Sequence, residues 1–383
     1  MDRRLPPPIA SILLAVAVLG LSACGARVGP PEPAATGPAW ERLADLPLTR
    51  RTGPVVAWTG QEVIAVGGEI GSTCPPMADC QEPNDSAKDG AALDPGTGRW
   101  RPIAAAPVPI PAFSPRAVVA GHLVVRVGSA LLDYEISADR WLRLPRAESG
   151  WYDVIADGSR VVLVSGSDED GVRADLAYDV ASRRWSRLPD DPIGPAFDRA
   201  MVRTPQGLVL LAHELVANPG GGDRPTFLLA ALLDRATGQW RRLPDADVIG
   251  GSSVSVVGNR VILPSLDATN GGGAGKGDYG RLVPYGGRLD LATKTWSPLP
   301  HAPEYLGGGW PVDAPGSPVL AADGWFYDDA TETWTSVPRP AGAPDRPGPA
   351  VWAGDHLIVV TGTFPGNDYD RIRDMRVWSF PKD

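Results

Sequence analysis

The sequence predicts an all-β fold: a seven-bladed β-propeller of four-stranded antiparallel blades, with the ring closed by the N-terminal strand. A phrase recurs along the chain, as in "DVASRRWSRLP", "DRATGQWRRLP" and "DLATKTWSPLP". Before most copies of the phrase, two short apolar segments flank a tight turn. The 45 Gly and 41 Pro residues among 383 favour many short strands over long helices.

The recurring phrase aligns on tryptophan. The seven aligned tryptophans are Trp40, Trp100, Trp141, Trp185, Trp240, Trp296 and Trp334. An aliphatic residue follows each of them three positions later. From Trp100 onward an acidic residue precedes each one by six positions, and Leu or Tyr precedes that acid. Self-similarity at spacings of 38 to 60 residues is typical of a solenoid or a propeller.

The segments between the phrases predict four strands in each repeat. Residues 116–120, "RAVVA", precede a Gly-His turn and a second apolar segment, "LVVRVG". A strand ending in Tyr-Asp or Leu-Asp and a strand containing the tryptophan then follow, which makes one propeller blade. The Asp is expected to cap the turn between the last two strands through its side chain. The tryptophan is expected to pack between blades, so the phrase is scaffold and not a repeated active site.

The two ends of the repeat array predict how the ring closes. The last repeat, after Trp334, has only three strands, and the first phrase, "AWERLADLP", has no blade before it. The N-terminal strand should therefore complete the last blade. Closure of this kind removes the unpaired strand edges of an open array.

The N-terminus reads as a targeting segment. Residues 1–23 begin with two arginines and continue with a 13-residue apolar run, which is too short to span a bilayer and fits a signal peptide. The sequence Leu-Ser-Ala-Cys ending at Cys24 resembles the lipobox of bacterial lipoproteins. That resemblance implies a lipid-modified Cys24, whereas the alternative is an ordinary secretory signal. Residues 24–38 are rich in Gly, Pro and Ala and read as a flexible tether, which leaves residues 39–383 for the propeller.

Charge and cysteine content limit the possible partners. Residues 1–23 carry a net charge of +1, so the rest of the chain carries −10 of the total −9, which does not favour nucleic acid. Outside the cytoplasm, Cys74 and Cys80 are expected to form a disulfide, worth roughly 2 kcal/mol at best. A metal site built on two cysteines is the weaker alternative. We expect a monomer anchored through Cys24 to the outer face of the cell membrane.

Several repeats carry glycine after their second strand, followed by the Tyr and the Trp. The segment "VIAVGGE" has the full Gly-Gly pair, and three other repeats keep one glycine. Over residues 40–383 this pattern resembles the kelch repeat and the galactose-oxidase-like propellers. The resemblance implies the propeller fold but not one function, because a fold of this kind serves many roles. Galactose oxidase holds copper with two Tyr and two His and cross-links one Tyr to Cys. That set cannot be placed in this sequence, so we expect no metal and no cofactor.

Insertions between the second and third strands predict where a ligand would bind. They cover residues 69–90, 214–226, 265–281 and 363–373, and they should emerge on the same face as the connections between blades. Insertions on one face of a repeat protein commonly mark the binding face, although drift in surface loops is the alternative. The candidate ligand-binding residues in or near these connections are Arg51, Trp151, Tyr152, Asp198, Arg199, Tyr305, Trp310 and Arg346.

Three functions are compatible with these patterns. The first is an extracytoplasmic, lipid-anchored module that binds an envelope protein or a glycan on the loop-rich face. The second is a carbohydrate-active enzyme of the oxidase or isomerase type that uses acids such as Asp198 or Asp313. No catalytic motif supports it, since His213-Glu214 lacks the second His of HExxH and "NGGGAGKG" lacks phosphate-loop spacing. The third is a structural component of an envelope complex.

Overall fold

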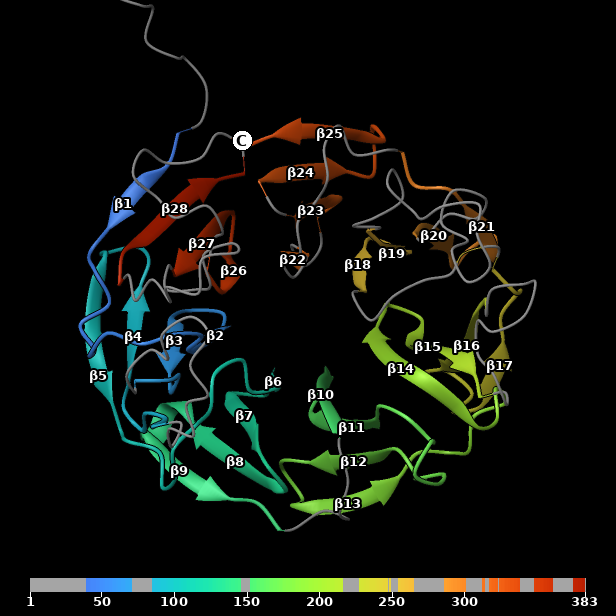
Figure 1. Cartoon of the computed structure of the whole chain (residues 1–383), viewed down its shortest axis with the longest axis horizontal. Coiled ribbons are helices and arrows are strands. Elements are labelled where there is room, and N and C mark those ends of the chain that lie inside the picture. The colour runs from blue at the N-terminus through green and yellow to red at the C-terminus, as the bar shows by residue number, and fades with distance from the viewer. Residues whose placement is uncertain are drawn as a thin grey trace, which may run out of the picture. The chain divides into compact units, whose positions relative to one another are not determined.

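Seven four-stranded antiparallel sheets are arranged around a ring in this computed structural model (Figure 1), which confirms the predicted fold class. All of these sheets belong to the unit Pro38–Asp383. The structure describes residues 39–70, 85–145, 152–215, 227–246, 248, 254–264, 286–300, 312–313, 317–322, 324–337, 348–360 and 375–382.

The first four blades follow one another along the chain. Blade 1 consists of β2 (Val55–Trp58), β3 (Val63–Val66), β4 (Gly90–Asp94) and β5 (Arg99–Ile103). Blade 2 consists of β6 (Arg116–Val119), β7 (His122–Val127), β8 (Ala130–Glu135) and β9 (Arg140–Arg143). Blade 3 consists of β10 (Tyr152–Asp157), β11 (Arg160–Ser165), β12 (Leu176–Asp179) and β13 (Arg184–Arg187). Blade 4 consists of β14 (Ala196–Arg203), β15 (Gly207–Glu214), β16 (Leu228–Asp234) and β17 (Trp240–Arg242).

The remaining blades complete the ring. Blade 5 consists of β18 (Ser255–Val257), β19 (Arg260–Leu263), β20 (Gly287–Asp290) and β21 (Thr295–Ser297). Blade 6 consists of β22 (Val312–Asp313), β23 (Val319–Ala322), β24 (Trp325–Asp328) and β25 (Thr333–Ser336). Blade 7 consists of β26 (Ala350–Ala353), β27 (His356–Val360), β28 (Val377–Pro381) and β1 (Glu41–Leu43).

The ring closes as the sequence predicts. β1, from the start of the described chain, is the outermost strand of blade 7 and runs antiparallel to β28, with Glu41 opposite Ser379 and Leu43 opposite Val377. The two strands lie side by side in Figure 1, where blue meets red. The hydrogen bonds between them join the two ends of the array and cover the outer edge of β28.

The recurring aspartate caps the turn between the last two strands, as predicted. Oδ1 of Asp234 accepts hydrogen bonds from the backbone N–H groups of Ala236 and Thr237, at 2.8 and 3.1 Å. Asp94 and Asp290 accept from the same two positions, while Asp179 accepts from the N–H of Ser182 and Asp328 from that of Ala330. Blade 2 differs, because its acid is Glu135 and its turn contains a short 3-10 helix, Ile136–Ala138.

Each recurring tryptophan ties its blade to the preceding one. The indole N–H donates to the backbone carbonyl of the residue four positions after the previous tryptophan of the series, at 2.7 to 3.3 Å. The described pairs are Trp100 with Ala44, Trp141 with Ala104, Trp185 with Pro145, Trp240 with Pro189, Trp296 with Pro244, and Trp334 with Pro300. The expectation that tryptophan packs between blades is therefore confirmed.

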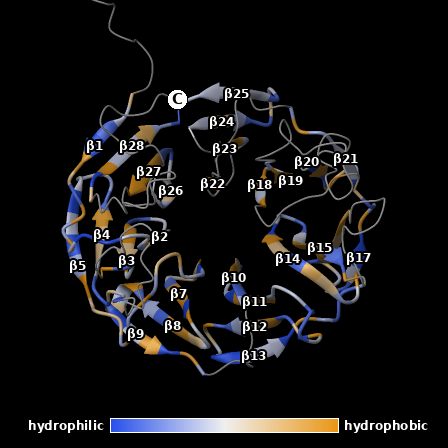
Figure 2. Ribbon diagram, in the orientation of Figure 1, coloured by the Kyte–Doolittle hydropathy of each residue, from blue (hydrophilic) through white to orange (hydrophobic). Residues whose placement is uncertain are grey.

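The hydrophobic core lies between neighbouring blades. One cluster joins Val55 and Ile64 of blade 1 to Leu123 and Leu132 of blade 2, all of them buried. Figure 2 shows hydrophobic residues on middle strands such as β4 and β27, and hydrophilic residues on outer strands such as β5 and β13. Within the described residues, no helix has the length and apolar character needed to cross a membrane.

The two faces of the ring differ in the lengths of their connections. On one face, here called the turn face, short turns join the first strand of a blade to the second and the third to the fourth. On the other, here called the loop face, lie the blade-to-blade connections and those between second and third strands. Four of the latter are long, as predicted: Val66 to Gly90, Glu214 to Leu228, Leu263 to Gly287, and Val360 to Val377.

Candidate functional site

Half of the predicted ligand-binding residues lie outside the described residues. These are Trp151, Tyr305, Trp310 and Arg346. Cys24 and the expected disulfide partners Cys74 and Cys80 also lie outside the described ranges. The structure describes the other four candidates: Arg51, Tyr152, Asp198 and Arg199.

Arg51 lies just before β2 and is buried, with 1% of the residue exposed. Its Nη1 and Nη2 atoms donate to both carboxylate oxygens of Asp89, at 2.9 and 3.0 Å, and Nε donates to the carbonyl of Thr49. The hydrogen bond from Arg51 holds the pKa of Asp89 below its usual value. The bidentate pair thus connects the start of blade 1 to the chain that enters β4. Contact between Arg51 and a ligand stays a prediction.

Arg199, on the innermost strand of blade 4, is buried among three carboxylates. Its Nη2 atom lies 2.8 Å from Asp175, and Nη1 lies 3.1 Å from Asp191 and 3.8 Å from Asp168. Burial raises the pKa of Asp175, while the guanidinium opposes that shift. Asp168 and Asp175 come from the β11–β12 connection of blade 3, so the cluster joins two blades at the loop face. Ligand contact by Arg199 also stays a prediction.

Tyr152, the first residue of β10, is buried at 2% exposure. It packs in the cluster between blades 2 and 3 with Val124, Leu163 and Leu176. Tyr152 therefore contributes to the core that positions the start of β10.

Asp198 occupies a β-bulge on the innermost strand of blade 4. Phe197 lies opposite His213 and Ala200 lies opposite Leu211, so β14 contains one more residue than β15 between these pairs. Asp198 has a φ of +48°, in the left-handed region that non-glycine residues rarely adopt. Its side chain is 63% exposed, while the next residue turns into the protein. A bulge of this kind redirects a side chain, and such strain is concentrated at functional sites.

His213 lies beside the bulge, on β15. Its Nδ1 atom is 3.9 Å from the Asp198 carboxylate, which makes an ion pair only when the imidazole is protonated. The ring stacks on Phe197 with centroids 5.2 Å apart and planes at 26°, and the residue is 5% exposed.

Three more charged residues lie at the loop-face ends of blades 2 and 3. Arg116 begins β6, Asp153 is the second residue of β10, and Arg126 is near the end of β7. Burial lowers the pKa of both arginines and raises that of Asp153, and each arginine interacts electrostatically with Asp153. Arg116 and Asp153 are nevertheless exposed to solvent. The pKa shifts indicate that protein surrounds these side chains, and their exposure indicates that solvent still reaches them. A position near the axis of the ring satisfies both conditions.

Arg116 has a guanidinium group that is only partly used by the protein. Nε donates to the carbonyl of Val56, on the innermost strand of blade 1, at 2.6 Å. To the described residues, the side chain makes no other hydrogen bond. Within the described part of the chain, its two terminal nitrogens have an electrostatic interaction with Asp153 and no hydrogen bond. Together with Arg126, Asp153 and Asp198, Arg116 defines the site called here the inner rim.

Phe113 adds an exposed aromatic side chain next to the inner rim. It lies three residues before Arg116 in the connection from blade 1 to blade 2, and it is 40% exposed. Its φ is +55°, and its N–H donates to the carbonyl of Gly53. A Cβ on Gly53 would lie 2.7 Å from the Phe113 ring, so this close approach requires glycine.

The sequence pattern indicated Asp198 as a candidate but not Arg116, Arg126, Asp153 or Phe113. A signal for Arg116 exists, because it interrupts an apolar position. The equivalent residues, three positions before the end of the innermost strand in other described blades, are Val55, Val154, Ala200 and Ala350. Comparing the blades at this one position would have identified Arg116.

Among the described residues, no group of three or more His, Cys, Asp or Glu side chains could hold a metal ion. What the inner rim offers is charge. Arg116 and Arg126 interact electrostatically with the Asp153 carboxylate, and Asp198 adds a second carboxylate on blade 4. The arrangement can bind a charged group, and the Asp198 carboxylate lies 3.9 Å from Nδ1 of His213.

Comparisons with known proteins support the fold. No protein-family model matches the chain, and no curated protein matches it. A solved structure described as "YCF48 bound to D1 peptide" matches with a TM-score of 0.52 and 14% sequence identity. The match covers 92% of this chain and 98% of that chain. At this identity the likeness shows the propeller fold alone.

Proposed function

We propose that this protein is an extracytoplasmic, lipid-anchored binding module whose inner rim takes a peptide segment of a partner protein. The observation that carries the proposal is Arg116. The residue is exposed, burial by surrounding protein lowers the pKa of its guanidinium, and the described residues accept a hydrogen bond only from its Nε atom. A partly desolvated arginine binds a carboxylate more strongly than one in open water.

The surroundings of Arg116 favour a carboxylate-bearing segment with an apolar neighbour. Arg116 and Arg126 both interact electrostatically with Asp153, and burial raises the pKa of Asp153. The terminal nitrogens of a guanidinium can donate two parallel hydrogen bonds to one carboxylate. Phe113, exposed three residues earlier, supplies an apolar surface beside that charge. Aromatic and arginine side chains are the residues that contribute most to protein interfaces.

The structural neighbour supports a peptide as the ligand. The structure described as "YCF48 bound to D1 peptide" is a complex of a propeller with a peptide. The same architecture can therefore present a peptide-binding surface. The choice of a carboxylate-bearing peptide rests on the residues of this chain, since the likeness extends only to the fold.

The location rests on the N-terminal sequence. The Leu-Ser-Ala-Cys motif ending at Cys24 supports lipid attachment there, and the Gly, Pro and Ala-rich residues after it support a tether. An anchored propeller would meet partners at the outer face of the cell membrane. Metabolic labelling with a fatty-acid analogue, compared between the natural chain and Cys24→Ser, tests this part of the proposal.

Photo-cross-linking at the site tests the binding function. Phe113 is replaced in the full-length chain by a photo-reactive phenylalanine analogue, and cells are irradiated. The control carries the analogue at Thr237, an exposed turn-face residue of blade 4. We expect an adduct at position 113 that is lost when Arg116→Gln is added, and none at position 237. Equal adducts at both positions, or an adduct that Arg116→Gln leaves unchanged, would contradict the proposal.

One observation favours a second candidate, a carbohydrate-active enzyme of the oxidase or isomerase type. The Asp198 side chain is exposed, and its carboxylate lies 3.9 Å from Nδ1 of His213. The backbone of Asp198 has a φ of +48°. If this pair transfers a proton, Asp198→Asn should abolish turnover of a sugar substrate while the Phe113 adduct persists. A sugar turnover that survives Asp198→Asn would remove this candidate.

A further inference from the structure

A cluster of arginines on the turn face surrounds a single carboxylate. Asp157, the last residue of β10, lies 2.5 Å from Nη2 of Arg160, 3.4 Å from Nη2 of Arg235 and 3.9 Å from Nε of Arg203. The aspartate side chain is 10% exposed, and the three arginine side chains are 39 to 48% exposed. All three guanidinium groups therefore converge on one point and still reach solvent.

The cluster departs from the repeat pattern of the turn face. Asp157 and Arg203 are the final residues of the innermost strands of blades 3 and 4. The innermost strands of blades 1, 2, 5 and 7 end in Trp58, Val119, Val257 and Ala353, and that of blade 6 ends in Asp313, so Arg203 is the one arginine at this position among the described blades. Arg235 belongs to the β16–β17 turn, and its N–H donates to the carbonyl of Gln206 in the β14–β15 turn. Two adjacent turns of blade 4 thus bring their arginines to the aspartate of blade 3.

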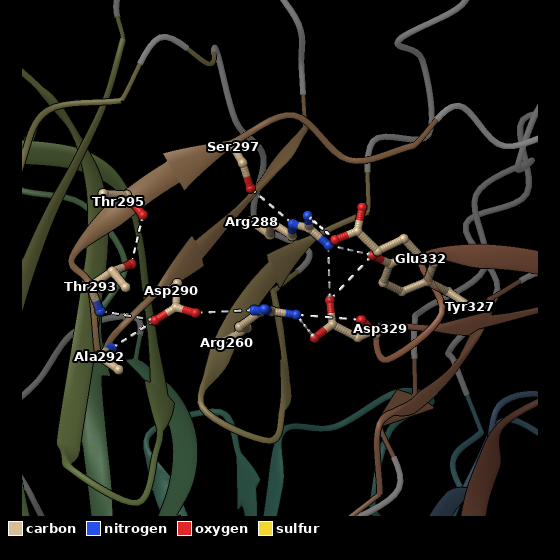
Figure 3. A network of polar contacts seen from close by, with 10 residues as sticks. All are labelled: Arg260, Arg288, Asp290, Ala292, Thr293, Thr295, Ser297, Tyr327, Asp329 and Glu332. Carbon is tan, nitrogen blue, oxygen red and sulfur yellow. Dashed lines mark hydrogen bonds and ion pairs between the residues drawn. The ribbon is translucent and has the colours of Figure 1, made fainter.

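Other polar clusters of the described protein have enough acid to balance their arginines. Figure 3 shows the network between blades 5 and 6, in which Arg260 and Arg288 contact three acids. The acids of that network are Asp290, Asp329 and Glu332. Arg199 on the loop face also faces three acids. Among the ion-pair clusters of the described residues, the Asp157 cluster alone has more arginines than acids.

We propose that Arg160, Arg203 and Arg235 bind a phosphate monoester group on the turn face. Three guanidinium groups and one carboxylate leave an excess of two positive charges, in a chain with a net charge of −9. A phosphate monoester carries a charge of about −1.5 to −2 at neutral pH and has three acceptor oxygens, which matches that excess. Arginine is the residue best suited to such a group, because its planar fork donates several hydrogen bonds in fixed directions. Asp157 holds the three forks together when the site is empty.

Titration calorimetry with phenyl phosphate on the full-length chain in detergent tests the proposal. The variants are Arg203→Gln and Arg235→Gln, and the control is Arg187→Gln, an exposed arginine on the outer strand of blade 3. Losing a hydrogen bond to a charged group should weaken binding by about tenfold or more in each variant and leave the control unchanged. The 3.9 Å contact of Arg203 is partly exposed, so its loss should spare the fold.

The pH dependence gives a second readout. Arginine stays charged throughout, whereas a phosphate monoester gains a proton near its second pKa of about 6. Binding should therefore weaken between about pH 7.5 and pH 5. Equal affinity of the natural chain and both site variants, or no binding at all, would overturn the proposal.

A third arm identifies the source of the phosphate. Vesicles of phosphatidylcholine with phosphatidic acid present the monoester as a lipid headgroup. Co-sedimentation that requires Arg203 would assign a lipid, and binding of phenyl phosphate without co-sedimentation would assign a soluble compound. Both outcomes support the site. Because this site is on the turn face, cross-linking at Phe113 should be unchanged in Arg203→Gln, so the two proposals can fail independently.

Discussion

The two faces of the ring are built from different kinds of residues. On the turn face the same groups recur from blade to blade, as with Asp234 and Asp290, whose carboxylates accept hydrogen bonds from the backbone of the turn. On the loop face the notable groups occur once: the Arg199 cluster, the Asp198 bulge and Arg116. The recurring groups solve a problem that every blade shares, namely how to turn a strand and pack on a neighbour. The groups that occur once have a role at one position only, as the residues of a binding site do.

The Asp157 cluster combines features of both faces. It lies on the turn face, and Arg203 and Arg235 have no arginine at the equivalent positions of the other described blades, whereas Arg160 has a counterpart in Arg260 of blade 5. A departure from the repeat therefore identifies candidate sites on either face better than the face itself does. Substitutions can measure how much the recurring groups and the single groups each contribute to stability.

The largest effect is expected at Arg199. Arg199→Met removes the only described guanidinium among three buried or partly buried carboxylates, so Asp175 and Asp168 remain without their counter-charge. Breaking a buried ion pair on one side costs about 3–5 kcal/mol of the free energy of unfolding. Arg187→Met, at an exposed site of blade 3, should stay within about 0.5 kcal/mol of the natural chain. Denaturant unfolding measures both, and similar losses would show that Arg199 is no more important than a surface residue.

Among recurring groups, the tryptophan bridge should have the next largest effect. Trp141→Phe keeps an aromatic ring next to Tyr134 but removes the 2.7 Å hydrogen bond to the carbonyl of Ala104. The loss should be about 1 kcal/mol, the usual net value of such a bond. Trp58→Phe is the matched control, because Trp58 lies outside the series and makes no indole hydrogen bond to the described residues. An equal loss in the control would mean that ring volume, and not the bridge, stabilises the contact between blades.

The sequence predicted the recurring half of this comparison. Trp141 and Asp234 belong to columns that every blade needs, so the repetition of the pattern along the chain is enough to indicate their role. Ring closure by β1 was predictable for a similar reason, since one repeat lacked a strand and the N-terminus had one to spare. The number of blades and the order of strands in each followed from the same pattern.

The single groups were harder to predict because their partners come from distant parts of the sequence. Arg199 was identified as a candidate from its position, but Asp168 and Asp175 surround it only once blades 3 and 4 are packed together. The bulge at Asp198 depends on which residues of β15 pair with β14, and one sequence does not show that register. Arg116 was visible as a departure from an apolar position, whereas its coupling to Asp153 required the neighbouring blade.

Substitutions at Asp198 test whether the β-bulge of blade 4 lowers the free energy of unfolding. Asp198→Gly removes a side chain from a residue with φ of +48°, where glycine is not penalised. The free energy of unfolding should rise by about 1 kcal/mol. Asp198→Asn is the control, since Asn tolerates this conformation about as well as Asp does and should leave stability unchanged. A drop in stability in Asp198→Gly would mean that the carboxylate contributes more to the fold than its backbone costs.

The smallest effects concern pH, and they should have opposite signs on the two faces. Burial raises the pKa of Asp153 above its unfolded value, so its contribution to stability is present below about pH 3.9 and is lost as the pH rises through the folded pKa. The N–H of Thr293 lowers the pKa of Asp290, so that contribution is present above about pH 3.9 and is lost as the pH falls through the folded pKa. At neutral pH, Asp153→Asn should therefore be more stable than the natural chain and Asp290→Asn less stable. Both differences should shrink in acid. Unfolding curves across this pH range measure both differences. Shifts of the same sign would show that the inner rim stabilises the charged form of Asp153, as the turns stabilise the charged form of Asp290. Asp153 would then have no property that distinguishes it from a structural aspartate.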